Sequence, residues 1–160
     1  MTLEQRVAAL LDECRSRGFK IATAESCTGG MVAALLTSIA GSSDVFDCGY
    51  VTYSNEAKIG MLGVSPEIIA EFGAVSRECA LAMAHGAILK SAATLAVSIT
   101  GIAGPGGGSS AKPVGLVHFA CAQINGATLH REERFGDIGR DGVRKASVDV
   151  ALDLLEAQLL

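Results

Sequence analysis

The feature that most constrains the fold of this chain is the order in which short apolar segments, polar loops and helix-forming segments follow one another. Residues 19–24, 45–53 and 94–100 are rich in apolar, β-branched or aromatic side chains, and each is followed directly by a polar or glycine-rich segment. After the first two, apolar residues recur at helical spacing in residues 31–39 and 54–62. Strands that alternate with helices in this way are typical of an α/β fold with parallel strands.

The rest of the chain predicts a hairpin and further helices. Asn125-Gly126 is a strong turn signal between two strand-like segments, residues 114–123 and 127–135. Helices are expected over residues 3–17, from 65, over 76–90 and over 143–159, with a polar loop at 137–141. We therefore expect one domain over residues 1–160, a three-layer α/β/α sandwich with a mixed, mostly parallel five-stranded sheet.

Charge and composition argue against several functional classes. The chain has 13 Lys and Arg against 17 Asp and Glu, and no basic run, so we expect no nucleic-acid partner. Five scattered cysteines without a C-x-x-C pair, and three histidines without metal-ligand spacing, predict no disulfide framework and no metal site. No apolar run is long enough to span a membrane, and the N-terminus does not resemble a secretory signal, so we expect a cytoplasmic protein.

The first candidate site is the segment T-A-E-S-C-T-G-G, residues 23–30, between an expected strand and an expected helix. In open α/β sheets ligands bind at the carboxyl ends of strands, and free amides at a helix N-terminus favour negative charge. Ser26 is therefore a candidate nucleophile. Two alternatives stay open: a hydroxyl here only caps the helix, or Cys27 is an activated thiolate. The amides expected to receive an oxyanion are those of Thr28, Gly29 and Gly30.

The second candidate site is the segment from Tyr53 to Lys58, which again follows an expected strand. Beside a buried serine, Lys58 would act as a neutral amine base, because burial and cationic neighbours lower the pKa of a lysine. The Tyr53 hydroxyl would bond to either group. The alternatives are an ordinary exposed lysine and a core tyrosine.

The third candidate site is the glycine-rich segment T-G-I-A-G-P-G-G-G, residues 100–108. It matches neither a P-loop nor a dinucleotide-binding fingerprint, but its exposed amides could line a substrate. A flexible connection is the alternative. Arg140 and Arg144 stand four residues apart at an expected helix start, where they would either clamp an anionic group or remain solvated.

In order and spacing, the segments A-E-S-C-T-G-G, V-T-Y-S-N-E-A-K and T-G-I-A-G-P-G-G resemble the CinA C-terminal domain family, over nearly the whole chain. The family fold is a three-layer sandwich with a mixed five-stranded sheet. Its members include stand-alone nicotinamide mononucleotide deamidases and fusions to a molybdopterin-biosynthesis-like domain, for which 160 residues leave no room. The resemblance therefore implies a stand-alone amidohydrolase that converts nicotinamide mononucleotide to nicotinate mononucleotide and ammonia, in pyridine nucleotide recycling.

The resemblance also implies roles for residues. It places the family's serine nucleophile at Ser26, its lysine base at Lys58 and its tyrosine at Tyr53, with the serine proton passing to the lysine directly or through the tyrosine. It implies no metal or organic cofactor and a small-molecule nucleotide as partner, and we expect a homo-oligomer. The alternatives are a Cys27 hydrolase and a non-catalytic nucleotide-binding module linked to competence or DNA damage. The residues expected to bind substrate are Glu25, Asn55, Thr100, Gly101, Gly104, Gly106, Arg140 and Arg144.

Overall fold

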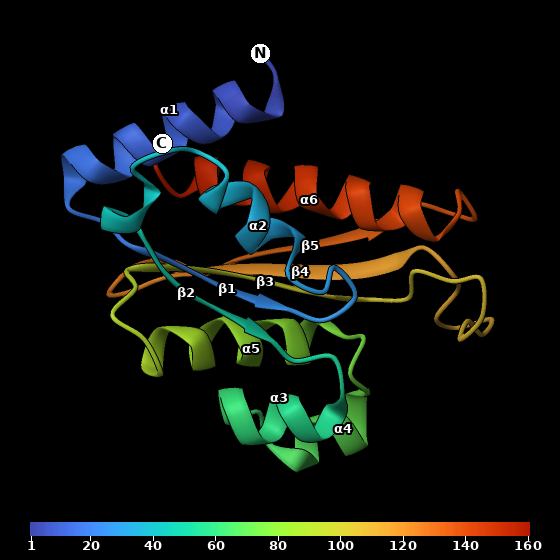
Figure 1. Cartoon of the computed structure of the whole chain (residues 1–160). Helices are drawn as coiled ribbons and strands as arrows, with labels where there is room; N and C mark the ends of the chain where they lie inside the picture. The colour runs from blue at the N-terminus through green and yellow to red at the C-terminus, as the bar shows by residue number, and fades with distance from the viewer.

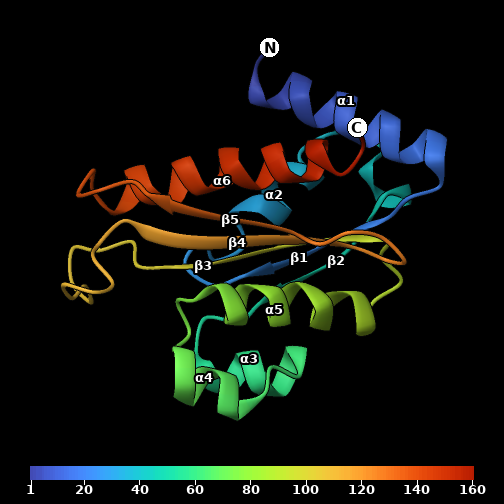
Figure 2. The same cartoon turned by 180° about the vertical axis from the view of Figure 1, so that it is seen from behind.

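The computed structural model describes residues 1–160 and has three layers, with helices on both faces of one sheet (Figures 1 and 2). The strand order is β2-β1-β3-β4-β5. Strands β1, β2 and β3 pair in parallel, whereas β4 is antiparallel to both β3 and β5, so only β4 runs against the others. The predicted mixed, mostly parallel sheet is thus confirmed. The strands are β1 (Ile21–Glu25), β2 (Phe46–Val51), β3 (Leu95–Gly101), β4 (Leu116–Gln123) and β5 (Leu129–Arg134).

The helices divide between the two faces of the sheet. One face carries α1 (Leu3–Arg17), α2 (Met31–Thr37) and α6 (Arg140–Ala157), and the other carries α5 (Arg77–Leu89) (Figure 1). Helices α3 (Asn55–Leu62) and α4 (Pro66–Phe72) pack on the outer side of α5. A short 3-10 helix, η1 (Ser42–Asp44), was not predicted. No helix combines the length and the apolar character that crossing a membrane requires.

The start of α6 corrects the prediction of a polar loop over residues 137–141. The helix begins at Arg140, and the Val143 amide bonds to the Gly139 carbonyl at 3.0 Å. Arg140 and Asp141 are exposed on its first turn, so this turn carries no apolar periodicity that a sequence pattern could reveal.

Three apolar clusters hold the layers together. The largest lies between the sheet and α1, α2 and α6, and the second between the sheet, α3 and α5. The third consists of alanines of α5 and β4. Small residues allow the close approach of α3 to α5: a Cβ on Gly86 would lie 2.0 Å from the Leu62 carbonyl oxygen. The high glycine content is thus partly a packing requirement.

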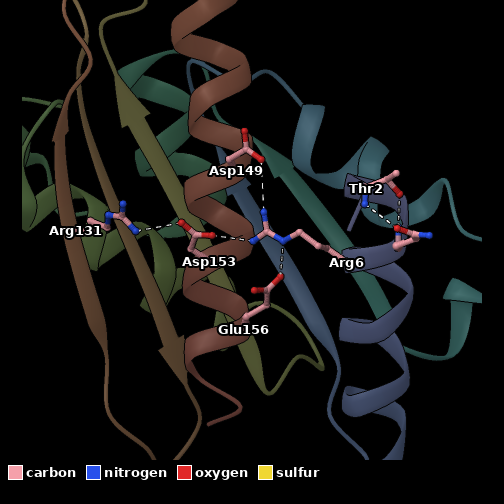
Figure 3. A network of polar contacts seen from close by, with 7 residues as sticks. Thr2, Arg6, Arg131, Asp149, Asp153 and Glu156 are labelled. Atoms are coloured by element: carbon pink, nitrogen blue, oxygen red, sulfur yellow. Dashed lines mark hydrogen bonds and ion pairs between the residues drawn. The ribbon is translucent and has the colours of Figure 1, made fainter.

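A network of ion pairs joins α1 to α6 on the outer side of the molecule (Figure 3). Arg6 donates to Asp153 at 2.8 Å and to Glu156 at 2.9 Å, and lies 3.6 Å from Asp149. Asp153 also lies 3.3 Å from Arg131 of β5. The network connects the N-terminal helix, the C-terminal helix and the edge strand.

Candidate active site

The carboxyl ends of β1, β2 and β3 meet at one edge of the sheet. Glu25, the last residue of β1, pairs in register with Val51 of β2 and Ile99 of β3. The three segments predicted to carry chemistry therefore converge, and together with the loop before α5 they form a cleft of about 200 Å³. The cleft is lined by Ser26, Cys27, Tyr53, Asn55, Lys58, Ala74, Val75, Thr100, Gly101, Ala103 and Arg140.

A serine and a lysine are in contact at the bottom of this cleft. Lys58 Nζ lies 2.9 Å from Ser26 Oγ, and it also donates to the carbonyl oxygens of Thr52 at 2.9 Å and Tyr53 at 3.2 Å. Lys58 is only 1% exposed, although it is the fourth residue of a short surface helix. No carboxylate oxygen lies within ion-pair distance of its amine.

Burial is the main influence on the protonation of Lys58. It lowers the pKa of the amine below its ordinary value of 10.5, because the charged form loses its hydration. The nearby thiols of Cys79 and Cys27 raise this pKa by a smaller amount. The cationic neighbours that the sequence led us to expect are not among the causes.

The turn that carries Ser26 leaves backbone amides free. The Ser26 amide donates to the Ile99 carbonyl of β3 at 3.0 Å, and the Gly29 amide donates to the Ser26 carbonyl at 3.1 Å. The predicted oxyanion donor Gly29 is therefore occupied, whereas the amides of Thr28 and Gly30 make no hydrogen bond within the protein. The Cys27 amide, which we did not predict, is free as well, and Cys27 lines the cleft.

The side chain of Cys27 does not have the character of an activated nucleophile. It is buried, and burial raises the pKa of the thiol to about 11. The cysteine-hydrolase alternative requires a lowered pKa. In contrast, the Ser26 hydroxyl is in direct contact with the Lys58 amine, whose pKa is lowered.

Glu25 was expected to bind substrate, but the structure places it beneath the cleft. The residue is fully buried, and its carboxylate accepts hydrogen bonds from the Thr28 hydroxyl and from the first turn of α2. Since these donors occupy both oxygens, the carboxylate is not available to a ligand in the cleft.

Tyr53 and Arg140 lie at the mouth of the cleft. The Tyr53 side chain is 60% exposed, and its hydroxyl accepts from Arg140 Nη2 at 3.0 Å rather than contacting Ser26 or Lys58. Arg140 Nη1 also donates to the Gly104 carbonyl at 2.9 Å, so one guanidinium connects the β2 loop to the glycine-rich loop. The predicted tyrosine relay therefore does not match this geometry. The Tyr53 contact with Lys58 comes instead from its backbone carbonyl.

Of the remaining predicted residues, some support the walls of the cleft and one lies outside it. The Thr100 hydroxyl donates to the Ala74 carbonyl at 2.9 Å and so fixes the wall formed by Ala74 and Val75. Arg144 Nε donates to the Cys27 carbonyl at 3.1 Å, and so contacts the turn formed by Ser26–Gly29. Gly106 is exposed and is not part of the cleft lining.

Two lining residues outside the three predicted segments were missed because they carry no chemical signal. Ala74 and Val75 are small apolar residues, and only the three-dimensional arrangement brings them into the cleft with the serine. A larger cavity of about 580 Å³ lies between α1 and the end of α6, but its lining is mostly apolar and contains no nucleophile. The smaller cleft is the one with the arrangement of reactive groups.

Comparisons with known proteins find relatives that match nearly the whole chain. A family model described as "CinA C-terminal domain" matches residues 2–159. The chain is 50% identical over 161 residues to the nicotinamide-nucleotide amidohydrolase PncC of Escherichia coli (strain K12), covering 100% of this chain and 94% of that protein. A CinA-like protein of Geobacter sp. (strain M21) is 51% identical over 158 residues, which are 99% of this chain but only 37% of that protein.

Solved structures show the same fold. The crystal structure of the competence/damage inducible protein CihA from Agrobacterium tumefaciens superposes with a TM-score of 0.95 at 55% identity, covering 97% of this chain and 94% of that one. A competence-damaged protein (CinA) superfamily protein from Klebsiella pneumoniae 700603 gives a TM-score of 0.92 at 34% identity, covering 99% of this chain and 98% of that one.

Proposed function

The chain belongs to the CinA C-terminal domain family, and from that membership we propose that it hydrolyses the carboxamide of nicotinamide mononucleotide to nicotinate mononucleotide and ammonia, in pyridine nucleotide recycling. One observation carries the proposal. The Lys58 amine is buried against the Ser26 hydroxyl in a cleft, with no carboxylate to retain its proton. Amide hydrolysis through an acyl-enzyme needs this combination of nucleophile and base.

The contacts of Lys58 fit a neutral amine. A neutral amine has two N–H bonds and one lone pair. Nζ lies within hydrogen-bond distance of three oxygens, the carbonyls of Thr52 and Tyr53 and the Ser26 hydroxyl. In the neutral form that we propose, the two N–H groups go to the carbonyls and the lone pair faces the Ser26 hydroxyl. The hydroxyl proton therefore transfers directly to Nζ, and no relay through the tyrosine hydroxyl is needed.

The reaction follows in two halves. Ser26 Oγ attacks the carboxamide carbon while its proton moves to Lys58 Nζ, and the protonated amine then gives that proton to the leaving nitrogen. The C–N bond breaks, ammonia departs and an acyl-serine remains. Water next attacks the acyl carbon and gives a proton to Nζ. The bond from carbon to Oγ breaks, and Ser26 regains its proton from Lys58.

The free amides of the nucleophile turn supply the oxyanion site in this proposal. The Ser26 carbonyl accepts from Gly29, and in a trans peptide the N–H points opposite to the C=O. The Cys27 amide therefore points away from Gly29, and it belongs to a residue that lines the cleft. We assign it as an oxyanion donor, with the free Thr28 amide as the second.

Two arginines are proposed to bind the phosphate of the nucleotide. The chain has eight arginines, and five of them pair with carboxylates: Arg6, Arg15, Arg17, Arg131 and Arg134. Arg140 and Arg144 have no acidic partner and lie one turn apart beside the cleft. Their unused N–H groups match a phosphate dianion. Asn55 and Gly101 line the cleft between these arginines and Ser26 in this proposal, whereas Gly104 does not line it and only holds Arg140 through its carbonyl.

Ammonia release from nicotinamide mononucleotide tests the proposal. Ser26→Ala removes the nucleophile and is expected to lower kcat by at least about 10³-fold. Cys27→Ala keeps the backbone amide and is expected to stay within about threefold of the parent protein. The opposite ranking of these two variants would establish the cysteine alternative, and a parent protein that binds the nucleotide without releasing ammonia would establish the binding-module alternative.

A further inference from the structure

The Glu25 carboxylate is a buried group that the reaction steps above do not use. It belongs to the last residue of β1, directly before the nucleophile, and it is fully buried. Oε1 accepts from Thr28 Oγ1 at 2.7 Å and from the Val32 amide at 2.9 Å, and Oε2 accepts from the Ala33 amide at 3.1 Å. All three donors come from the segment that follows Ser26.

These contacts give α2 the N-terminal cap that its own sequence lacks. The N-cap residue is Gly30, at a φ of 102°, and it has no side chain to accept a hydrogen bond. An N-cap side chain usually accepts from the second or third helical amide. Val32 and Ala33 are the second and third residues of α2, and Glu25 accepts from both. The cap therefore comes from the preceding strand instead of the loop.

Because the cap comes from the strand, the turn formed by Ser26–Gly29 is hydrogen-bonded at both ends, and the backbone amides between the two ends have no partner. At its start, the Ser26 amide is bonded to β3 through the Ile99 carbonyl. At its end, the carboxylate holds the Thr28 side chain and the beginning of α2. Between these anchors the Cys27 and Thr28 amides remain unbonded. An N-cap side chain inside the loop would instead constrain the residues that must face the substrate.

We propose that Glu25 is a positioning residue: its carboxylate caps α2 from beneath and so holds the Ser26–Gly29 turn in the geometry that attack and oxyanion binding require. The inference rests on the proposed function for its chemistry. The carboxylate contacts no reacting atom and acts only through the turn. Displacement of a catalytic group by about 1 Å costs about 100-fold in rate, so its loss lowers kcat and leaves KM nearly unchanged.

The first test is Glu25→Gln, which replaces one acceptor oxygen with an NH2 group that faces a backbone N–H. The expected result is a kcat about 100-fold lower, with KM within about threefold of the parent protein and the fold intact by circular dichroism. Glu156→Gln is the matched control, because it makes the same chemical change in the α1–α6 network. It is expected to leave kcat unchanged.

The second test is Thr28→Val, which removes one hydroxyl donor from the carboxylate and changes the shape little. It is expected to lower kcat about tenfold with KM unchanged. Thr37→Val is its control, since that hydroxyl lies at the end of α2 and bonds only to the carbonyls of Ala33 and Ala34. If Glu25→Gln does not fold, Thr28→Val decides alone.

A fluorophosphonate probe separates this inference from the proposed function. The probe forms a bond from phosphorus to Ser26 Oγ as fluoride leaves and the serine proton passes to Lys58, and it requires no nucleotide recognition. If the parent protein is labelled but releases no ammonia, the proposed function fails and the labelling rate still tests Glu25. Slower labelling in step with the fall in kcat supports the inference. Labelling and kcat within about threefold of the parent in the folded variants would overturn it.

Discussion

Lys58 and Arg6 are both held in place by several oxygen atoms, but the chemistry of those oxygens differs. Arg6, with a side chain 22% exposed, faces the carboxylates of Asp149, Asp153 and Glu156 (Figure 3). Lys58 is 1% exposed and faces one hydroxyl and two carbonyls. Hydrogen bonding to Glu156 is the largest cause that raises the pKa of Arg6, whereas burial lowers the pKa of Lys58.

The fold thus stabilises the charged form of Arg6 and destabilises the charged form of Lys58. A carboxylate partner favours the charged form, and burial among neutral groups disfavours it. The first arrangement connects helices, and the second provides the base of the proposed reaction. Substitutions that exchange the surroundings of the two cations test this difference.

The largest effect is expected from making the buried cation permanent. Lys58→Arg keeps a positive charge that cannot be released near neutral pH, so the base is lost. We expect kcat to fall by at least about 10³-fold, without recovery at alkaline pH. Lys58→Met serves as the matched control without charge and should be equally inactive. Activity in Lys58→Arg close to that of the parent protein would show that the position need not be neutral.

A smaller effect is expected from giving Lys58 an acidic partner. The buried Cys79 thiol is one of the groups that influence the pKa of Lys58. In Cys79→Asp a carboxylate would raise that pKa, so we expect about tenfold lower kcat/KM at pH 7 and recovery at higher pH. Cys79→Ser changes the polarity without adding charge and should keep the parent pH profile. If the dependence of kcat/KM on pH did not shift in folded Cys79→Asp, the protonation of Lys58 would not control the activity.

The smallest effect is expected at the paired cation. Arg6→Met leaves Asp149 and Glu156 without a cation and Asp153 with Arg131 alone, and we expect a loss of about 1–2 kcal/mol in the free energy of unfolding. Urea denaturation measures it. The activity should remain that of the parent protein, because the network lies on the outer side of the molecule. If Arg6→Met lowered kcat as well as the free energy of unfolding, Arg6 would not be a purely structural cation.

Much of the fold follows from the sequence because the pattern is local. Runs of apolar and β-branched residues predict β1, β2 and β3, and Asn125-Gly126 marks the hairpin formed by β4 and β5. The start of α6 was placed too late, since its exposed first turn has no apolar periodicity. The 3-10 helix η1 was missed because so short an element has no periodicity to detect.

The part of the site that could be predicted is the set of residues that directly follow the parallel strands. Parallel strands place their carboxyl ends together, so the residues that follow β1 and β2 had to meet, and Ser26 and Lys58 do. Sequence reasoning could not show where side chains point. Glu25 faces the start of α2 instead of a ligand, and the Tyr53 hydroxyl faces Arg140 instead of the serine. These orientations depend on long-range packing that spacing along the chain does not encode.

The protonation of Lys58 can be measured directly by NMR titration of the lysine side chain, with the Lys58 signal assigned by its absence in Lys58→Met. We expect a midpoint below the ordinary value of 10.5 and a parallel rise of kcat/KM with pH through that midpoint. Stability should rise over the same window up to 10.5, because the unfolded chain then binds a proton that the folded protein has released. A midpoint at or above 10.5, with activity independent of it, would contradict the account.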